Sequence, residues 1–390
     1  MTMHRRSLAV VAALGLLACG GEDGPSDIPA AGQWSEVLPG GNTICARGTE
    51  YRFFVRGGRS DRIIIDFQGG GACWNALTCS IADSLFSDST GTLADFEAAS
   101  NAQPPSGIYT SDPANPFADW TIVHIPYCTG DIHWGNSAQD YGNGVKIEHR
   151  GYVNASAALD WVYARYNPKN ILVNGCSAGA YGAILHSAYI TQRYPDADLS
   201  VLADSGAGII TDSFLKNSLP NWNAQASLPD IKALQVPIDQ LTLGDLYVAL
   251  AEKYPNNRYA QTATAYDADQ IFFFSAMGGQ AADWPTRFRS SLKTLTDRLG
   301  NFTSYVPPGS MHCVTPYDIL YRREVNGVKL SSWVEQLATG TLPAPVACEG
   351  NACCSDPVCD ACTGTASDPR YCRFCESWPP TWSSCAPPQP

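Results

Sequence analysis

Residues 170–182 read NILVNGCSAGAYG, and this stretch decides the fold class. The run NILV is short and apolar, which is typical of a buried strand. GCSAG at Gly175–Gly179 fits the G-x-S-x-G pattern of a sharp strand-to-helix turn, and a helix is predicted to follow as far as about Tyr194. The pattern predicts that Ser177 is a nucleophile above a parallel sheet. The alternative is the glycine-rich turn of a nucleotide-binding loop, but neither a P-loop lysine nor G-x-G-x-x-G accompanies it.

Strands and helices alternate on both sides of this turn. Further strands are predicted at 52–55, 62–67, 121–127, 199–203, 270–275 and 303–306. Further helices are predicted at 152–166 and 285–299. Because such alternation implies βαβ units, we expect an α/β class, with an α/β-hydrolase-like three-layer fold and a mainly parallel sheet. Residues 214–265 are irregular, and we interpret them as an insertion or cap over the sheet edge.

The composition limits the partners of the protein. The chain has 390 residues, 45% of them apolar, which is enough for a sizeable core, and its formal net charge is −12. This charge argues against nucleic acid and anionic membrane surfaces, because both attract basic faces. It also argues against a strongly anionic polymer as substrate, although a local field can differ from the net one. We expect residues 40–345 to form the catalytic domain.

The N-terminus has the features of a targeting signal. Two arginines precede an apolar run at 8–18 that is too short to span a bilayer, and the run ends in LLAC, which is similar to a lipobox. We expect a lipoprotein signal peptide at 1–18, lipidation of Cys19, and a flexible tether at 19–39. The expected location is a bacterial outer membrane or cell surface. An ordinary secretory signal, and thus a secreted protein, is the alternative.

A serine nucleophile needs a histidine base and an acid. In hydrolases of this fold the order along the chain is serine, acid, histidine, which leaves His312, in PPGSMHCVTP, as the predicted base. Asp283 follows the strand predicted at 270–275 and is the predicted acid, although an N-cap role before the next helix would also explain it. Asp204, in LADSG, is the alternative acid. Asp267 and Asp269 precede their predicted strand and fit less well.

A triple glycine, Gly69–Gly71, follows the strand predicted at 62–67. This is the position of the oxyanion loop in esterases of this fold. We predict that backbone N–H groups of Gly70, Gly71 and Ala178 stabilise the oxyanion. A flexible turn is the alternative, but three successive glycines cost conformational entropy.

Five blocks in order along the chain resemble the pectin acetylesterase / Notum carboxylesterase family. They are GGGACWNALTC (69–79), IPYCTGDIHWGN (125–136), GCSAG (175–179), LADSG (202–206) and MHC (311–313), within residues 40–342. The resemblance implies an α/β-hydrolase-like serine carboxylesterase without a cofactor. It implies Ser177 as nucleophile, His312 as base, Gly70, Gly71 and Ala178 as oxyanion donors and, by position, Asp283 as acid. The chain departs from the family at Ala72, where members often have tryptophan, and this bears on the acyl-chain preference.

The cysteine count points to disulfides. Without Cys19 the chain has fourteen cysteines, an even number in a chain expected to be exported. If Ser177 and His312 meet, the cysteines beside them fall near the roughly 5–6 Å Cα spacing that a disulfide needs. The candidate disulfides in the body are Cys73–Cys79, close in sequence, Cys176–Cys313 and, by elimination, Cys45–Cys128.

Residues 346–390 form a cysteine-rich tail without apolar periodicity, which the family blocks do not cover. Two C-x-x-C pairs, at 359–362 and 372–375, are similar to zinc knuckles. In an exported chain we expect disulfides there rather than zinc, and thus no metal. The aromatic residues of the tail suggest, from composition alone, a wall- or carbohydrate-binding role.

These observations predict a serine carboxylic-ester hydrolase that removes short acyl groups, such as acetyl, from a polysaccharide. A broad carboxylesterase acting on lipid or polyester substrates is the first alternative. A catalytically inactive, surface-exposed carbohydrate-binding lipoprotein is the alternative from another class. The expected partners are the ester substrate and a membrane reached through the lipid anchor only.

Overall fold

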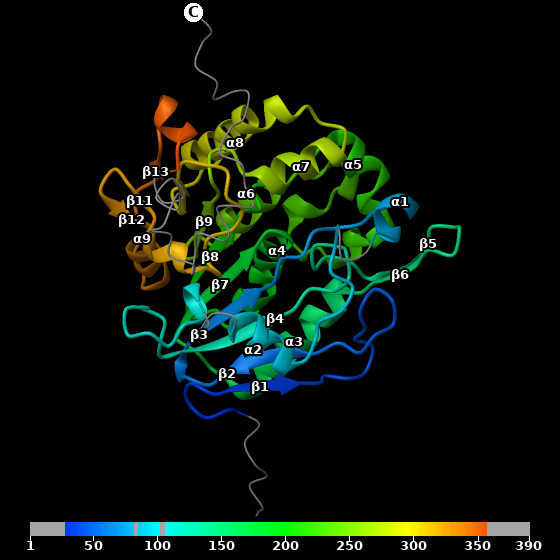
Figure 1. Ribbon diagram of the computed structural model, residues 1–390, viewed down its shortest axis with the longest axis horizontal. Helices are drawn as coiled ribbons and strands as arrows, with labels where there is room; N and C mark the ends of the chain where they lie inside the picture. Colours follow the sequence, from blue (N-terminus) through cyan, green and yellow to red (C-terminus); the bar gives the residue numbers. More distant parts are fainter. Residues whose placement is uncertain (1–27, 82–84, 102–105, 357–390) are drawn as a thin grey trace, which may run out of the picture.

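The computed structural model describes residues 28–81, 85–101 and 106–356, and a nine-stranded sheet runs through them (Figure 1). The strand order is β1-β2-β4-β3-β7-β8-β9-β10-β13. The strands are β1 (Trp34–Val37), β2 (Phe53–Arg56), β3 (Arg59–Phe67), β4 (Trp120–Ile125), β7 (Asn170–Cys176), β8 (Asp198–Asp204), β9 (Arg258–Thr262), β10 (Phe302–Val306) and β13 (Val346–Ala347). β1 and β2 are antiparallel to their neighbours, whereas all pairs from β4 to β13 are parallel. The mainly parallel sheet confirms the predicted fold class.

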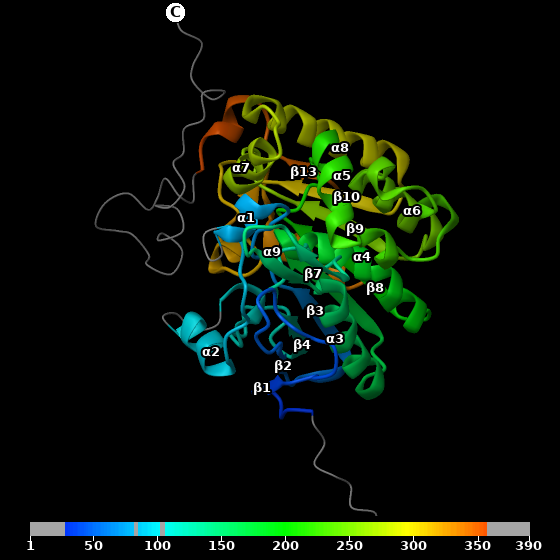
Figure 2. The same ribbon diagram turned by 90° about the vertical axis from the view of Figure 1, so that its right-hand side faces the viewer.

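Helices cover both faces of this sheet. They are α1 (Ala76–Ser80), α2 (Leu93–Asn101), α3 (Gly151–Arg165), α4 (Ala178–Arg193), α5 (Asp212–Asn217), α6 (Leu243–Lys253), α7 (Ala268–Ala276), α8 (Trp284–Arg298) and α9 (Leu330–Ala338). Ile63 and Ile65 of β3 belong to the core that includes α3 and α4, whereas Ile64 packs in a second core with Trp333 of α9. This alternation follows from the two-residue period of a strand. Figure 2 shows α3, α4 and α6 together on one side of the sheet.

Two small antiparallel ladders lie outside the main sheet. They are β5 (Ser137–Asp140) with β6 (Lys146–His149), and β11 (Glu324–Val325) with β12 (Val328–Lys329). The strands predicted at 52–55, 62–67, 121–127, 170–173, 199–203 and 303–306 are confirmed with small shifts at their ends. The helices predicted at 152–166 and 285–299 are confirmed in the same way.

The strand predicted at 270–275 is wrong, because these residues lie in helix α7. A short apolar run does not distinguish a strand from a buried helix. Here Asp267 caps the helix, since its carboxylate accepts a hydrogen bond from the Gln270 N–H at 3.0 Å.

The strand that fills this place in the sheet is β9, inside the segment interpreted as an insertion or cap at 214–265. Because β9 lies between β8 and β10, the segment at 214–265 is only partly an insertion or cap, and its last part belongs to the sheet. Polar residues in β9 conceal it in the sequence. Arg258 is buried because it pairs with Asp198 and donates to the Leu337 carbonyl at 2.9 Å.

Residues 346–356, which the sequence assigns to the tail, pack on the main domain. β13 pairs with β10, a disulfide joins Cys348 to Cys353, and Asp356 accepts two hydrogen bonds from Arg323 at 2.8 and 2.7 Å. The rest of the tail, the predicted signal peptide and Cys19 lie outside the described residues.

Candidate active site

Ser177 occupies a sharp turn between β7 and α4. Its backbone has φ 56° and ψ −123°, a conformation that non-glycine residues rarely adopt. Glycines are required on both sides: a Cβ at Gly175 would collide with the Gly179 carbonyl, and one at Gly179 with the Phe67 carbonyl. The turn therefore has the strained, closely packed form expected of a nucleophile elbow.

His312 lies in the loop that follows β10, and the loop is held from several sides. Asp204, at the end of β8, accepts hydrogen bonds from the Val314 N–H at 2.8 Å, and from the N–H and hydroxyl of Thr315 at 2.7 and 2.8 Å. The Cys176–Cys313 disulfide, with Cα atoms 5.7 Å apart, ties the same loop to the residue before Ser177. Asp204, the alternative acid, thus anchors the loop through Val314 and Thr315.

The carboxylate on the imidazole is that of Asp267. Its Oδ1 lies 2.8 Å from His312 Nδ1, and its side chain is fully buried. Gln270 supports it, because its Nε2 donates to Asp267 Oδ2 at 2.9 Å while its Oε1 accepts from the Ala207 N–H at 2.8 Å. These contacts of Asp267 and Gln270 hold the His312 imidazole in one orientation, as a general base would need.

The prediction that Asp283 is the acid is therefore corrected to Asp267. Asp283 is exposed, at the end of a 3₁₀ turn and directly before α8, whereas Asp267 occupies the Nδ1 side of His312. The error follows from the strand predicted at 270–275. With that run in helix α7, the loop after a strand end is the one after β9, and this loop contains Asp267.

A second carboxylate lies on the opposite edge of the same ring. Asp269 Oδ2 is 3.7 Å from His312 Nε2, and about a third of its side chain, 34%, is exposed. Burial alone lowers the pKa of His312, but Asp267, Asp269 and Asp204 outweigh it and raise the pKa to about 9. Burial in turn raises the pKa of Asp269, and His312 opposes that shift.

The glycine loop lies against Ser177. A Cβ at Gly69 would come within 2.6 Å of the Cys176 carbonyl oxygen and 2.9 Å of Ser177 Cβ, so only glycine allows this approach. Gly70 and Gly71 have φ values of 154° and 73°. Gly71 and Ala178 both border a cavity that also contains Ser177 and His312. The predicted oxyanion residues thus gather around Ser177.

Two cavities meet at Ser177, and His312, Gly71 and Phe273 also line both. The first, which we call the apolar cavity, has a volume of about 70 Å³. Its apolar lining includes Trp74, Ile209, Ile210, Phe214, Met277 and Trp284. The second, which we call the polar cavity, has a volume of about 420 Å³. Its lining includes Gln68, Ser106, Tyr109, His124, Asp269 and Tyr317.

A second His–Asp pair, which the sequence analysis missed, lies at the polar cavity. Asp66 of β3 and His124 of β4 are register partners, and Asp66 Oδ2 is 2.7 Å from His124 Nδ1. Tyr109 Oη and Asn174 Nδ2 also donate to Asp66, each at 2.6 Å. The available signal was a polar residue near the end of each of two apolar strands.

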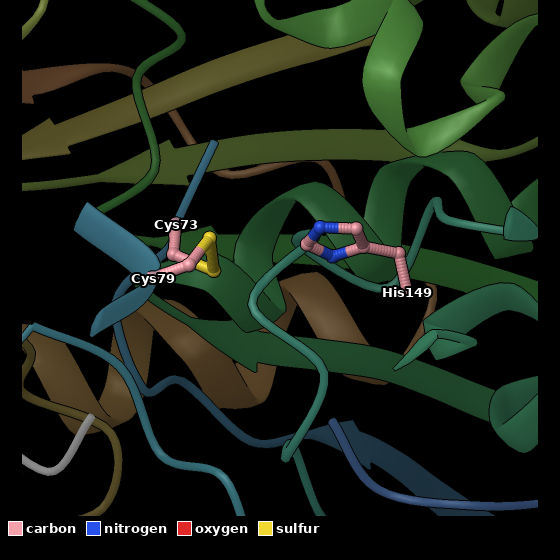
Figure 3. Close-up of side chains that lie close together, drawn as sticks. All are labelled: Cys73, Cys79 and His149. Carbon is pink, nitrogen blue, oxygen red and sulfur yellow. A yellow bond between two sulfur atoms is a disulfide. The ribbon is translucent and has the colours of Figure 1, made fainter. Parts of the chain in front are cut away.

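Among the residues that the structure describes, one group has metal-ligand types close together: Cys73, Cys79 and His149 (Figure 3). The two sulfurs form a disulfide. His149 Nδ1 is 2.8 Å from the Thr129 carbonyl, and its Nε2 is 2.9 Å from the Tyr141 hydroxyl. Because both ring nitrogens and both sulfurs already have partners, this group does not fit a metal site in its oxidised form.

The three disulfides predicted for the body are present. Their Cα separations are 5.1 Å for Cys45–Cys128, 4.9 Å for Cys73–Cys79 and 5.7 Å for Cys176–Cys313. The C-x-x-C pairs at 359–362 and 372–375 lie outside the described residues.

Comparison with known proteins connects this site to a family. Residues 40–223 match the Pectinacetylesterase family model. Pectin acetylesterase 5 of Arabidopsis thaliana is 29% identical over 47% of this chain and 43% of its own length. Pectin acetylesterase 7 of the same plant is 30% identical over 37% of this chain and 36% of its own length. The alignments thus span less than half of these relatives.

Among solved structures, the Wnt deacylase Notum from Drosophila superposes with a TM-score of 0.59. It is 14% identical, and the superposition covers 78% of this chain and 93% of that chain. At this identity the similarity shows the fold alone. The family model includes Ser177 and the glycine loop, whereas His312 and Asp267 lie beyond it.

Proposed function

We propose that this chain, whose residues 40–223 match the Pectinacetylesterase family model, is a member of that family and a serine carboxylesterase. The observation that carries the proposal is the geometry around one turn. Ser177 and His312 line the same two cavities, and a disulfide joins the cysteines beside them. Asp267 Oδ1 lies 2.8 Å from His312 Nδ1.

In the proposed mechanism, Ser177 Oγ attacks the ester carbonyl carbon while His312 Nε2 takes its proton. Asp267 accepts the Nδ1–H hydrogen bond and stabilises the imidazolium that forms. Backbone N–H groups of Gly70, Gly71 and Ala178 stabilise the oxyanion. His312 then returns the proton to the departing alcohol oxygen. Water, deprotonated by His312, then attacks the acyl carbon. The bond to Ser177 Oγ breaks, His312 returns the proton to that oxygen, and the acyl group leaves as a carboxylic acid.

The substrate that we propose is a short acyl ester of a polysaccharide, with acetyl as the acyl group. The difference between the two cavities supports this substrate. The small apolar cavity suits the acyl chain, and the larger polar cavity suits a hydroxylated alcohol. A broader carboxylesterase for lipid or polyester substrates is the second candidate. The apolar lining around Trp74, Phe214 and Trp284 favours it over a carbohydrate-binding protein without activity.

The test is hydrolysis of p-nitrophenyl esters of increasing chain length by the wild type and by Ser177→Ala. We expect kcat to fall by roughly 10⁴-fold or more in the variant, as for other serine triads. An optimum at acetyl supports the acetylesterase, and an optimum at longer chains supports the second candidate. No turnover by the wild type rejects the esterase, and turnover that survives in Ser177→Ala rejects this nucleophile.

We also propose that the protein is exported. Four disulfides within the described residues support this, since disulfides persist in oxidising compartments. In the part of the chain that the structure describes, no helix has the length and apolar character to cross a membrane. Lipidation of Cys19 stays a prediction, and mass analysis of the mature N-terminus tests it.

A further inference from the structure

Asp269 is the side chain that gives the polar cavity its charge. It is among the residues lining that cavity, and its carboxylate is 3.7 Å from His312 Nε2, the nitrogen on which the proposed mechanism depends. No lysine or arginine belongs to the described residues that line either cavity. Besides Asp269, the ionisable side chains of the polar cavity are the two imidazoles of His124 and His312 and the phenols of Tyr109 and Tyr317.

The other carboxylates near His312 are, like Asp269, negatively charged when ionised. Asp267 contacts His312 Nδ1 at 2.8 Å, and Asp204 holds the loop two and three residues further along. When His312 is neutral, which is the form that can accept the serine proton, the charge of Asp269 is not compensated by the ring. The whole chain adds a formal net charge of −12. An anionic group bound in the polar cavity would therefore meet repulsion from a carboxylate at short range.

Resting on the proposed esterase function, we infer that Asp269 selects against anionic alcohols, so that the substrate is an ester of a neutral sugar. A carboxylate offers two oxygens that accept hydrogen bonds, and sugar hydroxyls are donors that can meet them. With 34% of its side chain exposed, Asp269 is accessible for this contact. Polymers of acidic sugars, such as pectin, would then be poor substrates, in contrast to the name of the plant relatives.

The experiment compares two substrates that differ by one charge. A mono-acetylated methyl glucoside and the corresponding mono-acetylated methyl glucuronide share the ring and the acyl group, but the second has a carboxylate. We expect the wild type to prefer the glucoside by roughly tenfold in kcat/KM at low ionic strength, as for two like charges several ångströms apart. This preference should weaken at high ionic strength.

Asp269→Asn removes the charge and keeps the shape of the side chain. Because the variant also changes the surroundings of His312, its kcat is expected to change for both substrates, and the ratio of the two kcat/KM values is the readout. We expect the preference for the glucoside to fall to about threefold or less. Glu335→Gln, at an exposed position on α9, changes the net charge equally and is the matched control whose ratio should stay that of the wild type.

The outcomes separate this inference from the esterase proposal. A wild type that hydrolyses p-nitrophenyl acetate and shows no preference for the glucoside, or hydrolyses neither sugar ester, overturns the charge selection and leaves the esterase standing. An unchanged ratio in Asp269→Asn overturns the role of this residue. If the wild type hydrolyses no ester at all, titration with methyl glucoside and methyl glucuronide decides, and glucuronide binding as tight as glucoside binding overturns the inference.

Discussion

Within the residues that the structure describes, His312–Asp267 and His124–Asp66 are two pairs in which a carboxylate contacts a histidine Nδ1, in different surroundings. The Nδ1–Oδ distances are 2.8 and 2.7 Å. Both carboxylates accept further hydrogen bonds: Asp267 from the backbone and side chain of Gln270, and Asp66 from Tyr109 and Asn174. A hydrogen-bonded His–Asp pair alone therefore does not identify a catalytic base.

The surroundings of the two imidazoles distinguish them. His312 is in a loop and lines both cavities together with Ser177. His124 is inside the sheet, with Phe54 stacked at 6.3 Å and Phe96 at 5.1 Å between ring centroids, and it lines the polar cavity only. Its Nε2 is buried and has no hydrogen-bond partner among the described residues. The comparison teaches that position relative to Ser177, and not the pair itself, distinguishes His312 as the proposed base.

The largest expected difference appears when the aspartate of each pair is replaced by asparagine. Asp267→Asn should lower kcat on p-nitrophenyl acetate by about 10³–10⁴-fold, because His312 then loses the carboxylate that orients it and stabilises its cation. Asp66→Asn should lower kcat by less than about tenfold, since it affects the reaction only through packing near the polar cavity. Steady-state kinetics of folded variants measures both.

Asp283→Asn is the control for the acid, because Asp283 is exposed and Asp267 occupies the Nδ1 side of His312. A loss for Asp283→Asn comparable with that for Asp267→Asn would contradict the assignment of Asp267. A loss of 10³-fold for Asp66→Asn would contradict the distinction between the two pairs.

An intermediate effect is expected from removing the Cys176–Cys313 disulfide beside His312. His124 needs no such disulfide, because its strand is held by the sheet. Replacing Cys176 and Cys313 together by serine should lower kcat by about tenfold to a hundredfold, since a shift of the base by about 1 Å can cost that much. The assay belongs well below the melting temperature of the variant. The same double change at Cys45 and Cys128, which line neither cavity, is the control, and equal losses in kcat would reject the anchoring role.

The smallest effect concerns pH. His312 must be neutral to act as a base, and its pKa is raised to about 9, so kcat/KM should rise with pH and level off only above about 9. Asp269→Asn removes one of the negative charges that raise this pKa, so the rising limb should move to lower pH. The pH–rate profiles of wild type and variant measure this. A wild-type profile that is already level at neutral pH, or a limb that does not move, would contradict it.

Ser177 and His312 could be proposed as nucleophile and base from the sequence, because their signals depend only on local spacing and on order along the chain. The strained turn at Ser177 needs glycines at fixed offsets, and His312 is a histidine that follows the serine in a loop after a strand. The pairing of Cys176 with Cys313 follows from the same two positions. These inferences need no knowledge of distant contacts.

Asp267 could not be predicted in this way. Whether the apolar run at 270–275 becomes a strand or a helix depends on which part of the sheet it covers, and its composition suits both. Polar residues in β9 find buried partners on β8 and α9, which a local pattern does not reveal. Once the strand is misplaced, the acid expected after it is misplaced too.

The sequence by itself determined the fold class, the turn at Ser177, the choice of His312 as proposed base and the disulfide beside them, because each depends on residue types at short or ordered spacing. Only the tertiary structure decided the acid, the His124–Asp66 pair and the charge of the polar cavity. These depend on strand register and on which helix covers which strand end. Contacts of that kind form between residues far apart in the chain, where burial of the whole core outweighs local preference.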